Sequence, residues 1–415
     1  MKKSPLALIG ALLLVVLVVG LLAGCDGNET TTNTVASEPT ATTAASEPTT
    51  SAGVVATDTP AVASTGTTSA VSYPQQIYSI LQNMAGEGFD LERWKATAAA
   101  EKIIANARNG FLYADEMDPA VVAYWEALGV KKEMHDADDP ALKWYSYAPV
   151  QALAAGNTAV YPVVFSFSQE GTGIADLGTE KGFITVRPVN LGVPRDGNMP
   201  ADGLTPGRQV VRILDALETQ GYPIDRTRVY ATGHSIGGMA SAWAALEFPE
   251  VIAAIAMHSS LLAFNTDPSG ALVIPADQFT KAMDYDVPAW LAVGDVDLDQ
   301  LPIRTEGTTS GLNLWLQAND CPTQLTLADS LAAAAGTTDT AVKLIGVVGN
   351  ETWTQTIDDV VYHAVDYFRA DGLKMVEIVG VENHPHWVSA AYPELAWEFI
   401  SQFSKDAEGN LIVAQ

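Results

Sequence analysis

Short apolar runs alternate with helical patterns through most of the chain after residue 141. Runs of strand length, rich in β-branched and aromatic residues, are separated by segments such as GRQVVRILDALETQ (207–220) and YPELAWEFISQF (392–403), in which apolar residues recur every three or four positions. The predicted strands cover Leu142–Tyr147, Tyr161–Phe167, Gly182–Pro188, Arg228–Thr232, Val251–Met257, Ala289–Val293 and Lys374–Val379. Such alternation predicts an α/β protein with a mostly parallel, doubly wound sheet.

Residues 73–140 do not follow this alternation. The stretches QQIYSILQNM, ERWKATAAAEKIIANA and PAVVAYWEAL instead have the spacing of amphipathic helices. We therefore expect an N-terminal helical extension over 73–140, ahead of a catalytic domain that spans 141–415.

The first 72 residues have a different composition. Lys2 and Lys3 precede an apolar run that closes on Leu22-Ala23-Gly24-Cys25, which resembles the lipobox of bacterial lipoproteins. Residues 1–24 are then a signal peptide, and Cys25 is lipidated and anchors the protein outside the cytoplasm at the bacterial cell membrane. A plain transmembrane anchor is the alternative, because the run is nearly long enough to span a bilayer. Residues 25–72 are rich in Thr, Ser, Ala and Pro, and we expect them to be a disordered tether.

The net charge limits the partners that we expect, and the cysteine content limits the disulfides. The formal net charge is −27, and removal of the two signal lysines makes the mature form −29. So acidic a chain is not expected to bind nucleic acid or anionic lipid head groups. Cys321 is the one cysteine besides Cys25, so a lipidated chain has no pair for an internal disulfide. We find no spacing typical of a metal site, and no cofactor is expected.

The strongest motif is a Gly-Xaa-Ser-Xaa-Gly turn. In VYATGHSIGGMASAW (229–243) a strand pattern runs into this turn and a helix of small residues follows, which is the layout of a nucleophile elbow with Ser235 at its tip. Gly233, Gly237 and Gly238 leave room for so tight a turn. We expect Ser235 to be a nucleophile, and the backbone N–H of Ile236 to lie where an oxyanion forms.

A serine nucleophile requires a base, and six histidines are present. In folds with this elbow the base follows the last strand and precedes the last helix, which fits His384 and His386. His135, His234, His258 and His363 lie elsewhere in the chain. We favour His386 over His384, since Pro385 restricts His384 to extended conformations.

The acid is expected after the strand at 289–293. Asp295, Asp297 and Asp299 compete there, and we favour Asp297, which a short loop after Gly294 can turn across the sheet edge. Its role is to accept the Nδ1 proton of the base and to stabilise the imidazolium.

These blocks resemble the extracellular poly(hydroxybutyrate) depolymerase, feruloyl esterase and acetylxylan esterase group of α/β-hydrolases. The resemblance covers about residues 142–405 and rests on YPVVFSFSQEG, GIADLGTEKGFITVRPVN, YPIDRTRVYATGHSIGGMASAWAALEFPEVIAAIA, VPAWLAVGDVD and PHWVSAAYPELAWEFISQFSKD, which occur in the family's order. It implies an α/β-hydrolase fold and a triad of Ser235, Asp297 and His386.

One segment departs from the family. Where relatives typically have Leu-His-Gly-Gly after the third strand, this chain has Phe167-Ser168-Gln169-Glu170-Gly171. A main-chain N–H of Ser168 or Gln169 can still pair with that of Ile236 in an oxyanion hole, because the donors are backbone groups. Glu170, however, places a carboxylate near a developing negative charge, and a plain loop is the alternative.

Together these features predict a membrane-anchored extracytoplasmic serine esterase that hydrolyses carboxylic esters through an acyl-enzyme. A serine peptidase of the same fold and a catalytically silent surface lipoprotein that binds a polymer or glycan remain as alternatives. The sequence does not identify the acyl group of the ester, and polymeric and aromatic acyl groups are both compatible with it. Four tryptophans are candidates for a cleft, although core positions are the commoner place for this residue: Trp290, Trp315, Trp353 and Trp387.

Overall fold

The computed structural model separates the chain into two units, 1–72 and 73–415, and describes residues of the second. The described residues are 73–109, 117–136, 142–168, 173–193, 200, 202–260, 276–297 and 301–413. The proposed signal peptide, Cys25 and the tether lie outside them, as do Gln169, Glu170 and Asp299.

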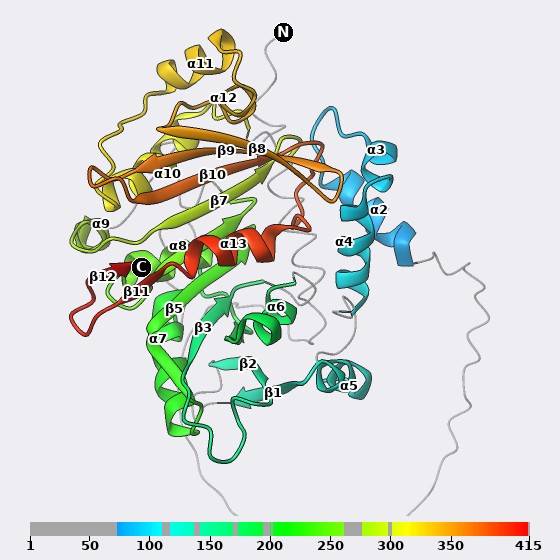
Figure 1. The fold of residues 1–415 in the computed structure, drawn as a ribbon, viewed down its shortest axis with the longest axis vertical. Helices are drawn as coiled ribbons and strands as arrows, with labels where there is room; N and C mark the ends of the chain where they lie inside the picture. Colours follow the sequence, from blue (N-terminus) through cyan, green and yellow to red (C-terminus); the bar gives the residue numbers. More distant parts are fainter. Residues whose placement is uncertain are drawn as a thin grey trace, which may run out of the picture. The chain divides into compact units, whose positions relative to one another are not determined.

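A ten-stranded sheet runs through the second unit in the order β1-β2-β4-β3-β5-β6-β7-β10-β9-β8 (Figure 1). Its strands are β1 (Val130–Asp136), β2 (Lys143–Pro149), β3 (Tyr161–Ser166), β4 (Ile184–Pro188), β5 (Ile224–His234), β6 (Ala254–His258), β7 (Ala289–Gly294), β8 (Glu351–Ile357), β9 (Val360–Phe368) and β10 (Lys374–Val381). The central strands from β4 to β10 pair in parallel, whereas β1 and β2 at one edge and β9 and β8 at the other pair antiparallel. A small hairpin, β11 (Phe403–Lys405) with β12 (Leu411–Val413), follows the last helix.

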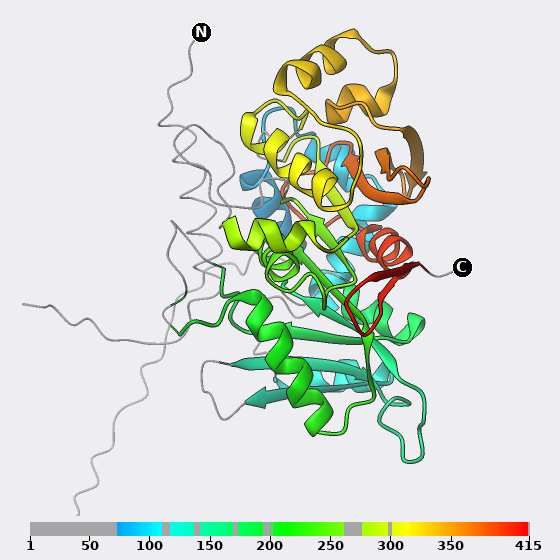
Figure 2. The ribbon, with the colours of Figure 1, turned by 90° about the vertical axis from the view of Figure 1, so that its left-hand side faces the viewer.

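Helices cover both faces of the sheet, as Figure 2 shows from the side. On one face lie α7 (Pro206–Thr219), α8 (Ile236–Glu247), α9 (Ala276–Met283) and α10 (Glu306–Ala318), and on the other α6 (Ile174–Lys181) and α13 (Tyr392–Ile400). Central strands such as β6 and β7 are buried along their whole length, because helices exclude water from both sides. This is the α/β-hydrolase fold that the sequence predicts.

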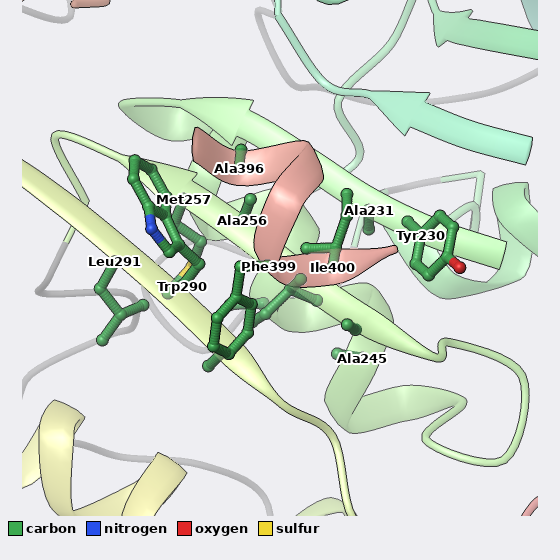
Figure 3. Packing of buried hydrophobic residues seen from close by; sticks show 14 of the residues in the cluster. Tyr230, Ala231, Ala245, Ala256, Met257, Trp290, Leu291, Ala396, Phe399 and Ile400 are labelled. Carbon is green, nitrogen blue, oxygen red and sulfur yellow. The ribbon is translucent and has the colours of Figure 1, made fainter. Parts of the chain in front are cut away.

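The core beneath α13 is built from large and small side chains in alternation. Figure 3 shows Ala396, Phe399 and Ile400 of α13 beside Trp290 of β7, with the small Ala256 of β6 between them. Trp290 is fully buried, and its Nε1–H donates to Glu377 Oε1 at 2.8 Å. Its indole therefore belongs to the core and is not part of a cleft.

The predicted strands are all present, with ends shifted by a few residues, but three strands of this sheet were not predicted: the edge strands β1 and β8, and β9 beside β8. β1 and β8 are rich in charged residues and threonine because they are partly exposed, so neither has an apolar run. Since β1 belongs to the sheet, the stretch 73–140 is not helical throughout.

The predicted helices of this stretch are present as α2 (Tyr73–Asn83), α3 (Leu91–Lys95), α4 (Ala98–Asn109) and α5 (Pro119–Ala127). In Figure 1, α2, α3 and α4 lie beside the end of the sheet at which the arrows of the parallel strands point. They share a small core of Ile77, Leu81, Trp94, Ala100 and Ile103. None of the helices in the described part of the chain is long and apolar enough to cross a bilayer.

Candidate active site

Ser235 stands at a sharp turn between β5 and α8. Its φ of 57° and ψ of −122° are a conformation that a residue with a side chain rarely adopts. A Cβ on Gly233 would lie 2.2 Å from the backbone of Gly237, and a Cβ on Gly237 would lie 1.5 Å from the carbonyl oxygen of Phe167. These two positions therefore require glycine, and the Ser235 N–H is held by the His258 carbonyl at 2.9 Å.

His386 lies between Ser235 and Asp297. Its Nε2 is 2.8 Å from Ser235 Oγ, and its Nδ1 is 2.7 Å from Asp297 Oδ1. His386 and Asp297 are almost completely buried, at 3% and 1% exposure. With its proton on Nδ1, the imidazole donates to the carboxylate and accepts the serine hydroxyl, which is the protonation needed for a general base.

The competing residues lie nearby but bond differently. His384 Nε2 is 3.0 Å from the Trp387 carbonyl oxygen of its own loop, and burial lowers the pKa of His384 to about 4. Asp295 accepts the His384 N–H at 3.3 Å, and burial raises the pKa of Asp295. Of the candidates in the described residues, the structure thus brings together Ser235, Asp297 and His386.

Of the residues expected to form an oxyanion hole, the structure describes Ile236 and Ser168. Ile236 is the first residue of α8, and N–H groups in the first turn of a helix have no partner within that helix. Ser168 uses its side chain here, because its Oγ accepts the His234 N–H at 2.9 Å. This hydroxyl ties the loop after β3 to the elbow, a role that sequence reasoning missed because the contact spans 66 positions.

Two further histidines, His234 and His258, lie beside the site, and neither ring is hydrogen-bonded to the Ser235 hydroxyl in the contacts described. The His234 ring lies 4.9 Å from that of His386, centre to centre. The Ser389 N–H donates to His258 Nε2 at 3.1 Å, so His258 connects the end of β6 with the loop that carries His386. Burial, followed by the neighbouring histidines, lowers the pKa of both His234 and His258 well below its usual range. A lowered pKa favours the neutral form of both rings. His258 is a structural link that sequence reasoning did not identify.

The remaining histidines and tryptophans are spread over the molecule. His135 bonds Ser146 through Nε2 at 2.8 Å on the β1 edge, and His363 Nε2 is 3.0 Å from Glu382 Oε1. Trp315, like Trp290, is buried in the core, whereas Trp353 and Trp387 are half-buried. In the residues that the structure describes, no three His, Cys, Asp or Glu side chains are grouped so that they could hold a metal ion.

Comparisons with known proteins agree with the fold. Residues 201–276, which contain the elbow, match the model of the prolyl oligopeptidase family. No curated protein matches the chain. Fold, elbow and family match together indicate a serine hydrolase of the α/β-hydrolase fold, in the class that contains esterases and peptidases.

Among solved structures, the chain is similar to an acetyl xylan esterase from Aspergillus awamori, with 14% identity, a TM-score of 0.41 and coverage of 66% of this chain and 98% of that one. It is also similar to a thermostable esterase (15% identity, TM-score 0.31, covering 46% of this chain and 52% of that one). A third similarity is to a puromycin-hydrolyzing peptidase of Mycobacterium tuberculosis (17% identity, TM-score 0.32, covering 46% and 34%). The chain thus spans about half of the thermostable esterase and a third of the peptidase.

Proposed function

We propose that this protein is a serine esterase in which Ser235, His386 and Asp297 form the catalytic triad. The observation that carries the proposal is the pair of hydrogen bonds made by His386, to Ser235 Oγ at 2.8 Å and to Asp297 Oδ1 at 2.7 Å. A histidine held between a hydroxyl and a buried carboxylate has the geometry required for nucleophile activation.

In this mechanism the Ser235 oxygen attacks the ester carbonyl while His386 Nε2 takes the hydroxyl proton. The tetrahedral oxyanion is bound by the Ile236 N–H together with the N–H of Ser168 or Gln169. His386 then gives its proton to the leaving alkoxide, and a water molecule, deprotonated by the same nitrogen, hydrolyses the acyl-enzyme. Asp297 keeps the Nδ1 proton directed at itself and stabilises the imidazolium without taking the proton.

The test of the proposal is Ser235→Ala measured on p-nitrophenyl acyl esters. We expect the rate to fall by several orders of magnitude, since the nucleophile is removed, with an unchanged thermal unfolding midpoint. A fluorophosphonate should label the wild type and not the variant. A wild type that neither hydrolyses esters nor is labelled would instead support the catalytically silent binding lipoprotein.

A peptidase of the same fold is the second candidate, and the match to the prolyl oligopeptidase family favours it. Both candidates predict ester hydrolysis, because an alkoxide leaves more readily than an amine. A p-nitrophenyl ester and the p-nitroanilide of the same acyl group therefore separate them. An esterase cleaves only the first, whereas a peptidase cleaves both. Methyl ferulate and acetylated xylan then test aromatic and polymeric substrates.

For location, we propose that lipid on Cys25 anchors the enzyme to the bacterial membrane from outside the cytoplasm. The support is the lipobox-like Leu22-Ala23-Gly24-Cys25 and the lysines before it.

A further inference from the structure

The segment Met84–Asp90, which joins α2 to α3, bonds to the loops of both the proposed acid and the proposed base. The His386 N–H donates to the Met84 carbonyl at 3.1 Å, and the Gly86 N–H donates to the Val296 carbonyl at 2.6 Å. Val296 is the residue before Asp297. One short stretch of the extension is thus hydrogen-bonded to the main chain of His386 and to that of Val296, beside Asp297.

The last residue of this segment, Asp90, makes a third connection, to the side chain of Asn383. Asn383 donates through Nδ2 to the Asp90 carbonyl at 2.9 Å, and its Oδ1 accepts the Asp90 N–H at 2.8 Å. Asn383 has a φ of 48° and stands three residues before His386. Asparagine tolerates this left-handed conformation better than most residues, so it can make both bonds from this turn.

Hydrophobic packing also connects the helices on either side of this segment to the loop of His386. Trp387, the neighbour of His386, packs against the small core of α2, α3 and α4 and also against the main core. At the far side of the extension, the Ala99 N–H donates to the Asp358 carbonyl at 3.0 Å, in the turn between β8 and β9. The helices that carry the segment are therefore attached to the hydrolase body at two separate places.

We propose that Met84–Asp90 is a positioning strap that sets the separation and orientation of the Asp297 and His386 loops. Catalytic geometry tolerates errors of only about 0.5 Å and 10–20°, and the acid and base here stand on two different loops. The strap supplies no reacting group. It acts through the main chain of His386 and Val296, and this inference rests on the proposed triad.

The first test removes single bonds of the strap in the full-length protein. Gly86→Pro deletes the N–H that bonds Val296, and Gly86→Ala is its matched control, because it keeps that N–H at a position without positive φ. Asn383→Gly deletes both bonds to Asp90 while allowing the left-handed backbone. Arg93→Ala removes the ion pair from the extension to Glu382 and none of these hydrogen bonds.

For Gly86→Pro and Asn383→Gly we expect kcat on a p-nitrophenyl ester to fall by about tenfold or more, with KM changed less than about threefold. Fluorophosphonate labelling of Ser235 should slow in parallel, and the low-field proton resonance of His386 Nδ1–H should broaden or disappear. Gly86→Ala and Arg93→Ala should stay within about twofold of wild type. A loss of stability alone would leave that resonance and the kcat of the folded fraction unchanged.

Two results would overturn the strap. One is a folded Gly86→Pro or Asn383→Gly protein with wild-type kcat and an intact resonance. The other is found in the wild type by hydrogen exchange, if the amides of Gly86 and His386 exchange as fast as unprotected ones. Hydrogen exchange is measured on the wild type, so it tests the strap even if Gly86→Pro fails to fold. A wild type that a fluorophosphonate does not label would instead refute the proposed triad, and with it the catalytic role of the strap, whereas a labelled wild type with unaffected strap variants would refute the strap alone.

Discussion

At the scale of single residues, two histidines of one loop differ in what their rings bond. The His386 ring lies between a hydroxyl and a carboxylate, whereas the His384 ring bonds the main chain of its own loop through Nε2. Both are buried, so burial does not separate them. The atoms within hydrogen-bonding distance of each ring are what distinguish His386, the proposed base, from His384.

We therefore predict that His386→Ala lowers ester hydrolysis about as much as Ser235→Ala does, since the members of a triad act as one unit. His384→Ala should change the rate by less than about tenfold, provided that circular dichroism shows the variant to be folded. Steady-state rates on one ester at neutral pH compare the two. An inactive, folded His384→Ala beside an active His386→Ala would reverse the assignment.

At this scale the sequence was sufficient to place Ser235 at a sharp turn between a strand and a helix, because the motif is local. Ser235 follows from five consecutive residues and their flanking elements. His258 and Ser168 were missed because their contacts join positions far apart in the chain, such as His258 with Ser389, and no local spacing records such a contact.

At the scale of elements, β9 and β10 bring two carboxylates together in the core. Asp366 and Glu377 are register partners on these antiparallel strands, and Lys374 bonds Glu377 and lies 3.5 Å from Asp366. Burial, and next the charge of Glu377, raise the pKa of Asp366 to about 7. One ammonium group thus stands beside two buried acids.

This pair predicts how stability depends on pH. Because the pKa of Asp366 is higher in the folded than in the unfolded protein, its carboxyl group binds more protons in the folded state between about pH 4 and pH 7, and its contribution to the free energy of unfolding falls as pH rises through that window. Asp366→Asn should raise the free energy of unfolding at pH 8 by on the order of 2 kcal/mol and remove this contribution to the pH dependence.

Urea unfolding at pH 5 and pH 8 measures both effects. The exposed Asp371→Asn is the control and should keep the wild-type slope. An Asp366→Asn protein whose stability changes between pH 5 and pH 8 by the same amount as that of the wild type would contradict a raised Asp366 pKa.

The edge strands also show the limit of sequence reasoning for elements. The central strands were predicted because burial on both faces makes them apolar throughout, whereas β8 is mostly exposed and reads ETWTQTI. The chain between β7 and β10 contains the hairpin of β8 and β9 and the helices α10, α11 (Leu327–Gly336) and α12 (Thr340–Ile345). Even so, β7 and β10 pair directly, which places the loops of Asp297 and His386 side by side.

At the scale of the whole molecule, the alternation of strands and helices was enough to predict the fold class, but not the function of the extension. Residues 73–140 were expected to form an N-terminal helical extension, without a stated role. Their contacts with His386 and Val296 pass through the main chain. Backbone hydrogen bonds leave no side-chain pattern from which they could have been predicted.

The proposed anchor yields a prediction for the full-length protein. Cys25→Ala should move the protein from the membrane fraction to the soluble fraction, because acyl chains on this sulfur are the hydrophobic anchor that remains after signal cleavage. Fractionation followed by immunoblotting measures the shift, and Cys321→Ala is the matched control. A Cys25→Ala protein that stays in the membrane with residues 1–24 uncleaved would indicate a transmembrane anchor instead.

The turn at Ser235 also bears on how far this protein can be stabilised. A serine held at φ 57° and ψ −122° costs on the order of 1–3 kcal/mol relative to a relaxed backbone. The close approach of Phe167 to Gly237 and the bond from the Ser235 N–H to His258 hold the turn in that state. Selection for greater thermostability cannot relax this turn without withdrawing the hydroxyl from its partner. Stabilising substitutions therefore have to act elsewhere in the molecule, since the strain at this turn is a condition of the proposed reactivity.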